Sequence, residues 1–302
     1  MLKLKGCFTA IVTPFRNGKI DKEALRGIVR FQLKGGVSGF VPCGSTGEAA
    51  TLSQEEYFEV IRLVVDEVKG RVPVMPGVGT NSTVRSVEMV KNVSALGVDG
   101  LLAIVPYYNK PTQEGMLAHF SGMARATRLP IVLYNIPGRT GVNMLPATVR
   151  ALRREFSNIA GIKEASGSLD QVSEIINITD KDFSVMSGDD SLTLPMMSVG
   201  ARGVISVVSN IVPAQASEMC ALFLKGEIAG AAKLHHNLFP LIKALFVETN
   251  PIPVKYAASL LGLCAPEPRL PLTPLTAKNR AALKKSMIET GVLSAAPDRA
   301  YD

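Results

Sequence analysis

Cysteine and histidine are scarce in this chain, and neither has the spacing of a metal site. The four cysteines form no Cys-x-x-Cys pair and lie far apart, at Cys7, Cys43, Cys220 and Cys264. This spacing argues against a zinc site and against a disulfide framework. The three histidines include no pair four residues apart; they are His119, His235 and His236. The sequence therefore predicts a reducing compartment and no metal ligands.

Long runs of one residue kind are also missing. Lysine and arginine number 33 against 26 aspartates and glutamates, but no five or six like charges follow one another. We therefore expect no nucleic-acid partner, while a net charge of +7 suits anionic small substrates. No stretch holds about eighteen uninterrupted apolar residues, and the first residues do not resemble a secretion signal. These absences predict a cytoplasmic protein without a membrane partner.

What the chain does contain is a regular alternation of short apolar segments and longer segments of helical period. With 302 residues, 47% of them hydrophobic, it can bury a large core. The apolar segments predict eight strands, at 6–13, 39–43, 72–78, 100–107, 130–136, 159–165, 183–187 and 203–208. The segments between and after them predict eight helices, at 22–34, 54–69, 84–96, 113–127, 146–156, 169–178, 192–199 and 213–224.

Eight units of strand followed by helix predict an α/β fold, the parallel (β/α)8 or TIM barrel. A doubly wound sheet is the alternative, but the turn at 13–18 after the first strand lacks the Gly-x-Gly-x-x-Gly pattern. After residue 226 the alternation stops, and the sequence predicts three helices at 227–246, 252–263 and 275–291. We therefore expect a catalytic barrel over 1–226 and a C-terminal helical appendage over 227–302.

One lysine interrupts the sixth predicted strand. Lys163 lies in the apolar and small-residue segment 159–165. At the end of a buried strand, an ammonium loses hydration, which favours the neutral amine that can form a Schiff base with a carbonyl substrate. The alternative is a lysine whose stem packs on apolar neighbours while its head reaches water.

The ends of the other predicted strands decide between these alternatives. In a TIM barrel the reacting groups lie at the carboxyl ends of strands and in the loops that follow. Two glycines and two hydroxyls at 44–48 can hold a carboxylate, and Arg139 can bind a second one. Tyrosine hydroxyls near 107 and at Tyr134 can relay protons. Together these residues favour catalysis at Lys163.

Five short motifs occur in order at these strand ends. They are Gly-Ser-Thr-Gly-Glu at 44–48, Pro-Tyr-Tyr-Asn-Lys-Pro at 106–111, Tyr-Asn-Ile-Pro-Gly-Arg-Thr at 134–140, Gly-Ile-Lys-Glu-Ala at 161–165 and Ser-Gly-Asp-Asp at 187–190. With them, nearly the whole chain resembles the dihydrodipicolinate synthases, of the pyruvate-dependent class I aldolase superfamily that includes N-acetylneuraminate lyase. The resemblance implies a cytoplasmic lyase of diaminopimelate and lysine biosynthesis. It would condense pyruvate with L-aspartate 4-semialdehyde, without a cofactor or metal.

The resemblance also implies roles for single residues. Lys163 would form the Schiff base, and Tyr134 would exchange protons with it through a relay with Ser45 and Tyr108. The family often has threonine where Ser45 stands, and its relay tyrosine at the Tyr108 position crosses a dimer interface. The residues implied in substrate binding are Thr46 for the pyruvate carboxylate, Arg139 for the aldehyde's carboxylate, and the backbones of Gly188 and Ile205 for the pyruvate pocket.

Assembly and regulation follow from the same resemblance. The family commonly forms homotetramers of tight dimers, and many members bind L-lysine in a crevice at the tight-dimer interface. The crevice positions here are Ala49, Ala50, Gln54, Tyr57, Asn81, Arg85 and Tyr107. Lysine-sensitive members carry a glutamate where Arg85 stands, and a guanidinium would repel the effector's ammonium group. The sequence therefore predicts weak or absent inhibition by L-lysine.

Other functions need features that this sequence does not offer. A sugar-acid aldolase or N-acetylneuraminate lyase is the alternative within the superfamily, although by resemblance the sialic-acid lyases lack the arginine of Gly138-Arg139-Thr140. A pyridoxal-phosphate enzyme would need a phosphate cup, and none can be nominated. A metal-dependent aldolase would need a histidine cluster. A non-catalytic barrel would have no use for a lysine, two tyrosines and an arginine at strand ends.

Overall fold

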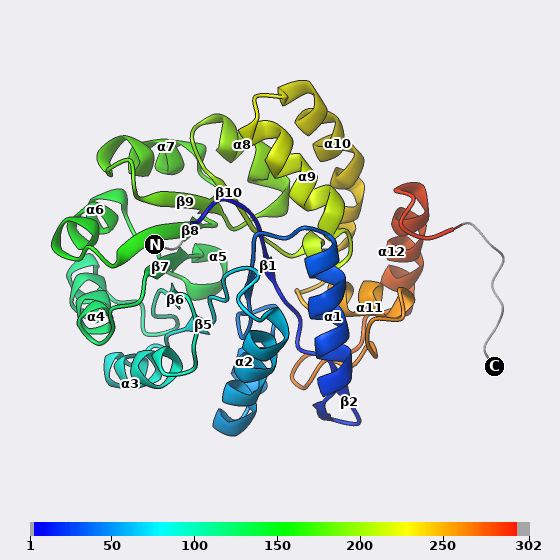
Figure 1. The fold of residues 1–302 in the computed structure, drawn as a ribbon, viewed down its shortest axis with the longest axis horizontal. Coiled ribbons are helices and arrows are strands. Elements are labelled where there is room, and N and C mark those ends of the chain that lie inside the picture. Colours follow the sequence, from blue (N-terminus) through cyan, green and yellow to red (C-terminus); the bar gives the residue numbers. More distant parts are fainter. Residues whose placement is uncertain (1–2, 295–302) are drawn as a thin grey trace.

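The protein is an eight-stranded parallel barrel, described by a computed structural model over residues 3–294. The strands run in the order β4-β1-β10-β9-β8-β7-β6-β5, and a parallel bridge between Phe40 and Val74 links the two ends of this order. Figure 1 shows helices around the sheet. The predicted TIM barrel is therefore confirmed. Its strands are β1 (Gly6–Ala10), β4 (Gly39–Val41), β5 (Gly77–Val78), β6 (Leu101–Ile104), β7 (Ile131–Asn135), β8 (Ile159–Glu164), β9 (Ser184–Ser187) and β10 (Gly203–Ser206).

A helix follows each strand, at the places that the apolar periodicity predicts and with ends shifted by a few residues at most. The barrel helices are α1 (Lys22–Lys34), α2 (Gln54–Val68), α3 (Thr83–Ser94), α4 (Gln113–Arg125), α6 (Pro146–Glu155), α7 (Leu169–Ile178), α8 (Thr193–Ser198) and α9 (Pro213–Leu224). Side-chain caps mark the starts of α1, α2, α4 and α7: for example, Asp21 accepts from the Ala24 amide, and Ser53 forms a reciprocal capping box with Glu56. Local capping therefore helps to fix where these four helices begin.

Three short features differ from the sequence prediction. The predicted strand at 72–78 is regular only over β5, because Pro73 and Pro76 have no N–H to donate to a neighbouring strand. The turn at 13–18 belongs to a hairpin, β2 (Phe15–Arg16) with β3 (Lys19–Ile20), closed by Asn17 and Gly18 at positive φ. A one-turn helix, α5 (Pro137–Thr140), follows β7.

Apolar side chains form two layers. Inside the barrel, a small cluster includes Phe8, Met75, Val132, Tyr134 and Ile205. A larger cluster fills the space between the strands and the helices, because successive side chains of a strand point to opposite faces. The same strands therefore bury both faces, as parallel sheets do.

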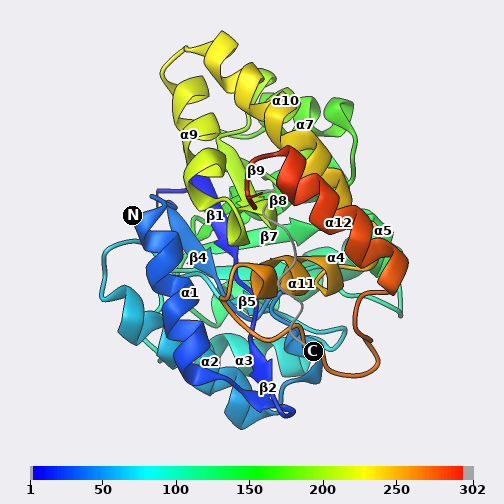
Figure 2. The same cartoon turned by 90° about the vertical axis from the view of Figure 1, so that its right-hand side faces the viewer.

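The C-terminal part consists of α10 (Ile228–Ala244), α11 (Ile252–Leu260) and α12 (Ala277–Glu289). Figure 2 shows α12 beside α10 and α11, and both of these helices contact it. All three contribute to the large apolar cluster that also covers the barrel strands. Residues 295–302 of the predicted appendage lie outside the described residues, and its standing as a separate domain stays a prediction.

Within residues 3–294, no helix is both long enough and apolar enough to cross a membrane.

Candidate active site

Lys163 and Tyr134 lie side by side at the carboxyl ends of neighbouring strands. The parallel register of β7 and β8 pairs Tyr134 with Lys163. Lys163 is only 6% exposed, and its Nζ lies 4.3 Å from the centroid of the Tyr134 ring. Tyr134 belongs to the cluster inside the barrel. The lysine's amine and the tyrosine's ring therefore face each other at the catalytic end of a TIM barrel.

The charge environment of Lys163 weakens its ammonium form. Burial lowers the pKa of Lys163 from 10.5 to about 8, and the Arg139 guanidinium acts in the same direction, while Asp190 opposes them. Among residues 3–294, no carboxylate forms an ion pair with Lys163. A buried lysine without such a partner has a substantial neutral fraction near physiological pH, and the neutral amine is the nucleophile.

Glu164, next to Lys163 in the chain, serves a different purpose. Because strand residues alternate, its side chain points away from the barrel interior. Its buried carboxylate accepts hydrogen bonds from Asn135 Nδ2 at 3.0 Å, from the Ser166 amide at 2.7 Å and from Gln171 Nε2 at 3.1 Å. These donors come from β7, the loop after β8 and α7. The network therefore fixes the ends of the two strands that carry Tyr134 and Lys163.

Tyr134 remains a phenol at neutral pH. Burial raises the pKa of Tyr134 to about 12, although Arg139 acts to lower it. A phenol with this pKa holds its proton and donates it when a neighbouring group gains negative charge.

Gly188 leaves room for the lysine. A Cβ atom at this position would lie 3.1 Å from Lys163 Cε and 2.6 Å from the Cβ of Ala165. The glycine at the end of β9 is therefore required by the close approach of β8. Ile205, on β10, lies in the cluster inside the barrel, beneath this end of the strands.

The turn at 44–48 approaches the same end of the barrel. Thr46 is buried and Ser45 is half-buried. The turn is held in place by the buried Thr13, whose Oγ1 donates to the Gly47 carbonyl at 2.7 Å. Glu48, at a positive φ of 54°, ends the turn and leads into the short helix Ala49–Thr51. Hydroxyls and backbone N–H groups gathered in such a turn are suited to a carboxylate.

Arg139 lies on α5, directly after β7. Its Nη2 donates to the Asn250 carbonyl at 3.1 Å, and the side chain is largely exposed. Its charge acts on both Lys163 and Tyr134, so it lies near both. The helix α5 thus places a guanidinium at the mouth of the site.

Tyr108 does not lie with Lys163 and Tyr134 in the barrel interior. Its side chain is 88% exposed, and its backbone has a φ of 72°, which is uncommon for a residue other than glycine. The loop after β6 therefore holds this tyrosine out from the chain.

Sequence reasoning missed a set of contacts between the site and the C-terminal part. Asn250, in the loop between α10 and α11, donates from Nδ2 to Thr46 Oγ1 at 2.9 Å. Lys255, on α11, is 0% exposed and its Nζ lies 2.6 Å from Glu48 Oε1. From the sequence, the segment Asn-Pro-Ile-Pro at 250–253 predicts only a break between two helices. No pattern in the sequence linked it to residues about two hundred positions earlier.

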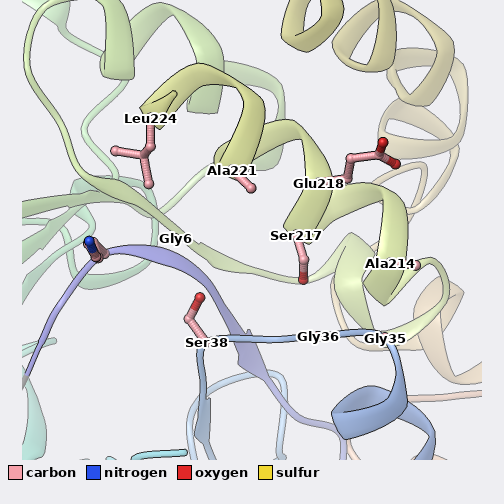
Figure 3. A pocket seen from close by; sticks show the side chains of 10 residues that line it. Gly6, Gly35, Gly36, Ser38, Ala214, Ser217, Glu218, Ala221 and Leu224 are labelled. Carbon is pink, nitrogen blue, oxygen red and sulfur yellow. The ribbon is translucent and has the colours of Figure 1, made fainter. Parts of the chain in front are cut away.

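A hollow at the other end of the barrel has different chemistry. It has a volume of about 380 Å3 and lies between the start of β1, the end of α1 and α9. Figure 3 shows that its side chains include Ser38, Ser217, Glu218 and Leu224. It lies at the amino ends of the strands, where TIM barrels do not carry their active sites.

In residues 3–294, no three or more His, Cys, Asp or Glu side chains are grouped so that they could hold a metal ion.

Comparisons with known proteins agree on one family. The model of the dihydrodipicolinate synthetase family matches residues 3–290. The 4-hydroxy-tetrahydrodipicolinate synthase of Oleidesulfovibrio alaskensis is 52% identical over 295 residues, covering 98% of this chain and 99% of the relative.

Two solved structures also resemble this protein over nearly the whole chain. Dihydrodipicolinate synthase from Acinetobacter baumannii, complexed with pyruvate, has a TM-score of 0.94 at 40% identity, covering 96% of this chain and 100% of that one. The enzyme from Cyanidioschyzon merolae, with lysine bound, has a TM-score of 0.93 at 42% identity, covering 96% of this chain and 99% of that one.

Proposed function

Because the chain belongs to the dihydrodipicolinate synthetase family, we propose that Lys163 is the residue through which it performs the family's reaction. It is a lyase of lysine and diaminopimelate biosynthesis that condenses pyruvate with L-aspartate 4-semialdehyde through a lysine Schiff base. The observation that carries the assignment to Lys163 is its burial beside Tyr134 without a carboxylate partner in residues 3–294. The alternative of a sugar-acid aldolase is not favoured.

The first half of the reaction uses the neutral amine. Lys163 Nζ attacks the ketone carbon of pyruvate, and loss of water from the carbinolamine gives the protonated imine. The Tyr134 phenol supplies the proton that the departing hydroxyl needs, because its raised pKa keeps it protonated. The Tyr134 phenolate left by this step takes a methyl proton from the imine and gives the enamine, which attacks the aldehyde carbon of the second substrate.

The turn at 44–48 holds the carboxylate of pyruvate during these steps. Thr46 donates to it, and Gly188 and Ile205 line the pocket for the rest of the small substrate. The bare Cα of Gly188 supports this role, because a Cβ atom there would collide with Ala165 at 2.6 Å and crowd Lys163 Cε at 3.1 Å. Ser45 completes a hydroxyl relay with Tyr134.

Tyr108 completes that relay in a neighbouring subunit. Its 88% exposure and unusual backbone support a role outside its own chain, since a tyrosine held in this way buries little of its surface against residues 3–294. The assembly is a homotetramer built from tight dimers, located in the cytoplasm. Mixing a Tyr108→Phe protein with a Lys163→Ala protein, under demonstrated subunit exchange, is expected to restore some activity, because each variant supplies the group that the other lacks. Without any recovery, Tyr108 would act in its own subunit.

Arg139 binds the carboxylate of L-aspartate 4-semialdehyde. A guanidinium matches a carboxylate with two parallel hydrogen bonds, and α5 presents it close to Lys163. Arg139→Ala is therefore expected to lower kcat/KM for the aldehyde far more than it lowers formation of the pyruvate adduct. The adduct serves as the internal control in the same variant. Equal losses in both measurements would make Arg139 a structural residue.

Regulation by L-lysine is expected to be weak or absent. Arg85 lies exposed on α3, and the acidic partner for the effector's ammonium is missing at that position. Loss of this charged hydrogen bond is expected to cost about 2 to 4 kcal/mol of binding free energy. Titration of L-lysine against initial rates, compared with Arg85→Glu, tests this. Inhibition only in the variant supports the charge argument, and strong inhibition of the unmodified protein contradicts it.

A further inference from the structure

A buried asparagine from the C-terminal part touches both side chains assigned to substrate carboxylates. Asn250 is 6% exposed; its Nδ2 donates to Thr46 Oγ1 at 2.9 Å, and its backbone carbonyl accepts from Arg139 Nη2 at 3.1 Å. We propose that Asn250 is a positioning residue that makes Thr46 a hydrogen-bond donor toward pyruvate. This inference rests on the proposed roles of Thr46 and Lys163.

The chemistry of the two side chains sets the direction of the bond. A threonine hydroxyl has one hydrogen and two lone pairs, whereas an amide nitrogen only donates. When Asn250 Nδ2 donates to Thr46 Oγ1, the hydroxyl keeps its own hydrogen for another acceptor. A carboxylate is an acceptor only, so it requires this orientation of Thr46.

The segment that carries Asn250 is tied to the turn at a second point. The Asn250 Oδ1 itself is buried and has no hydrogen-bond partner among the described residues, so within them its side chain bonds to Thr46 alone. Five residues further on, on α11, Lys255 is ion-paired with Glu48, at the end of the turn that carries Thr46. The start of α11 and the turn at 44–48 are thus joined at two points.

Two variants separate polarity from packing. Asn250→Ala removes the donor and is expected to weaken pyruvate binding about 2- to 12-fold, the equivalent of one hydrogen bond. Asn250→Asp keeps the shape of the side chain, but its ionised carboxylate accepts the hydrogen bond that Thr46 would otherwise donate to pyruvate. It also places a negative charge near the substrate carboxylate. We expect pyruvate binding to weaken about 100-fold or more, because like charges brought together cost several-fold more than a lost neutral bond.

The dependence on pH gives a second signature. A protonated aspartic acid can donate to Thr46 as the amide does. The difference between Asn250→Asp and the unmodified protein is therefore expected to shrink as the pH falls, while the difference for Asn250→Ala stays constant. A merely structural role predicts that the isosteric aspartate is tolerated better than alanine at every pH.

The experiment measures the pyruvate concentration that gives half-maximal trapping of the Lys163 adduct by borohydride. It needs no second substrate, so the proposed role of Arg139 in binding the aldehyde does not enter. Asn158→Ala is the matched control, because Asn158 directly precedes β8 at the end of the barrel opposite the site, where its Nδ2 donates to the Ala124 and Thr127 carbonyls at 3.0 Å. The expected order of increasing half-saturation is unmodified protein and Asn158→Ala together, then Asn250→Ala, then Asn250→Asp.

An Asn250→Asp protein that binds pyruvate as well as Asn250→Ala would overturn the proposal. If Asn250→Asp does not fold, a cycle of Asn250→Ala with Thr46→Val decides the question: the two losses must be coupled, and purely additive losses contradict the proposal. Failure of the proposed function has a different result, since the unmodified protein would then form no adduct at Lys163.

Discussion

Two lysines are buried within residues 3–294, and their surroundings give them opposite properties. Lys163, at the end of β8, is 6% exposed and has no ion pair within residues 3–294. Lys255, on α11, is 0% exposed, but Glu48 lies 2.6 Å from its Nζ. An aromatic ring lies close to both amines, Tyr134 at 4.3 Å from Lys163 Nζ and Phe15 at 4.2 Å from Lys255 Nζ, so the ion pair is the difference between them. Burial lowers the pKa of both, and beside Lys255 the carboxylate of Glu48 favours the ammonium.

The comparison shows that burial alone does not make a lysine a nucleophile. A paired and desolvated ammonium contributes to the structure, because it satisfies the carboxylate that ends the turn at 44–48. An unpaired one is unstable as a cation and is therefore available for imine chemistry. Arg269 strengthens the structural site, since its amide donates to Glu48 Oε2 at 2.9 Å and its guanidinium lies over Phe15.

The largest effect that separates the two lysines is expected in catalysis. Lys163→Met removes the only proposed imine-forming group, so kcat is expected to fall by at least about 1000-fold while the protein remains folded. Steady-state rates with circular dichroism measure both properties. A Lys163→Met protein that keeps a substantial fraction of the activity would contradict the assignment of Lys163 as the nucleophile.

A second test concerns stability at Lys255. Glu48→Gln leaves a buried ammonium without its counter-charge and is expected to lower the free energy of unfolding by about 3 to 5 kcal/mol. Adding Lys255→Met is expected to recover most of this loss, because the uncompensated charge disappears. Urea denaturation measures all three proteins.

The matched control for this test is an exposed ion pair. Arg125 and Glu155 lie 2.8 Å apart, with side chains 66% and 54% exposed. Glu155→Gln is expected to cost less than about 1 kcal/mol. Equal losses from Glu48→Gln and Glu155→Gln would show that the buried pair is not structural.

A third and smaller effect is the pH dependence of stability due to Lys163. Its pKa is about 8 when folded and 10.5 as the ordinary value, so the unfolded chain binds more protons between these pH values. Stability is therefore expected to rise with pH from about 8 to 10.5, by up to about 3 kcal/mol, and the penalty is fully present below pH 8. The difference in unfolding free energy between the unmodified protein and Lys163→Met measures it. A difference that does not change with pH would mean that the lysine is solvated.

Much of the fold follows from local pattern. Apolar runs and helical periodicity predict the eight strands and their helices, and caps such as Asp21 and Ser53 mark where helices begin. The hairpin at 15–20 and the single turn of α5 were not predicted, because elements of two to four residues are too short to show a period. At 72–78 the apolar run predicts a full strand, but two prolines interrupt its hydrogen bonds.

The site was predictable only in part. Lys163 stands out as one charge in a buried strand, and the parallel fold then places Tyr134 beside it. Asn250 and Lys255 could not be connected to the turn at 44–48, because a contact across about two hundred residues leaves no trace in a single sequence. The outward position of Tyr108 is likewise a property of its backbone conformation, which residue type does not determine.

The most direct test of this account is to treat the unmodified protein with pyruvate and borohydride and to map the modified peptide by mass spectrometry. One reduced pyruvoyl group on Lys163, with Lys255 unmodified, is the predicted result. Modification of Lys255 or of another lysine, or no pyruvate-dependent modification at all, would contradict the claim that the unpaired buried lysine is the nucleophile.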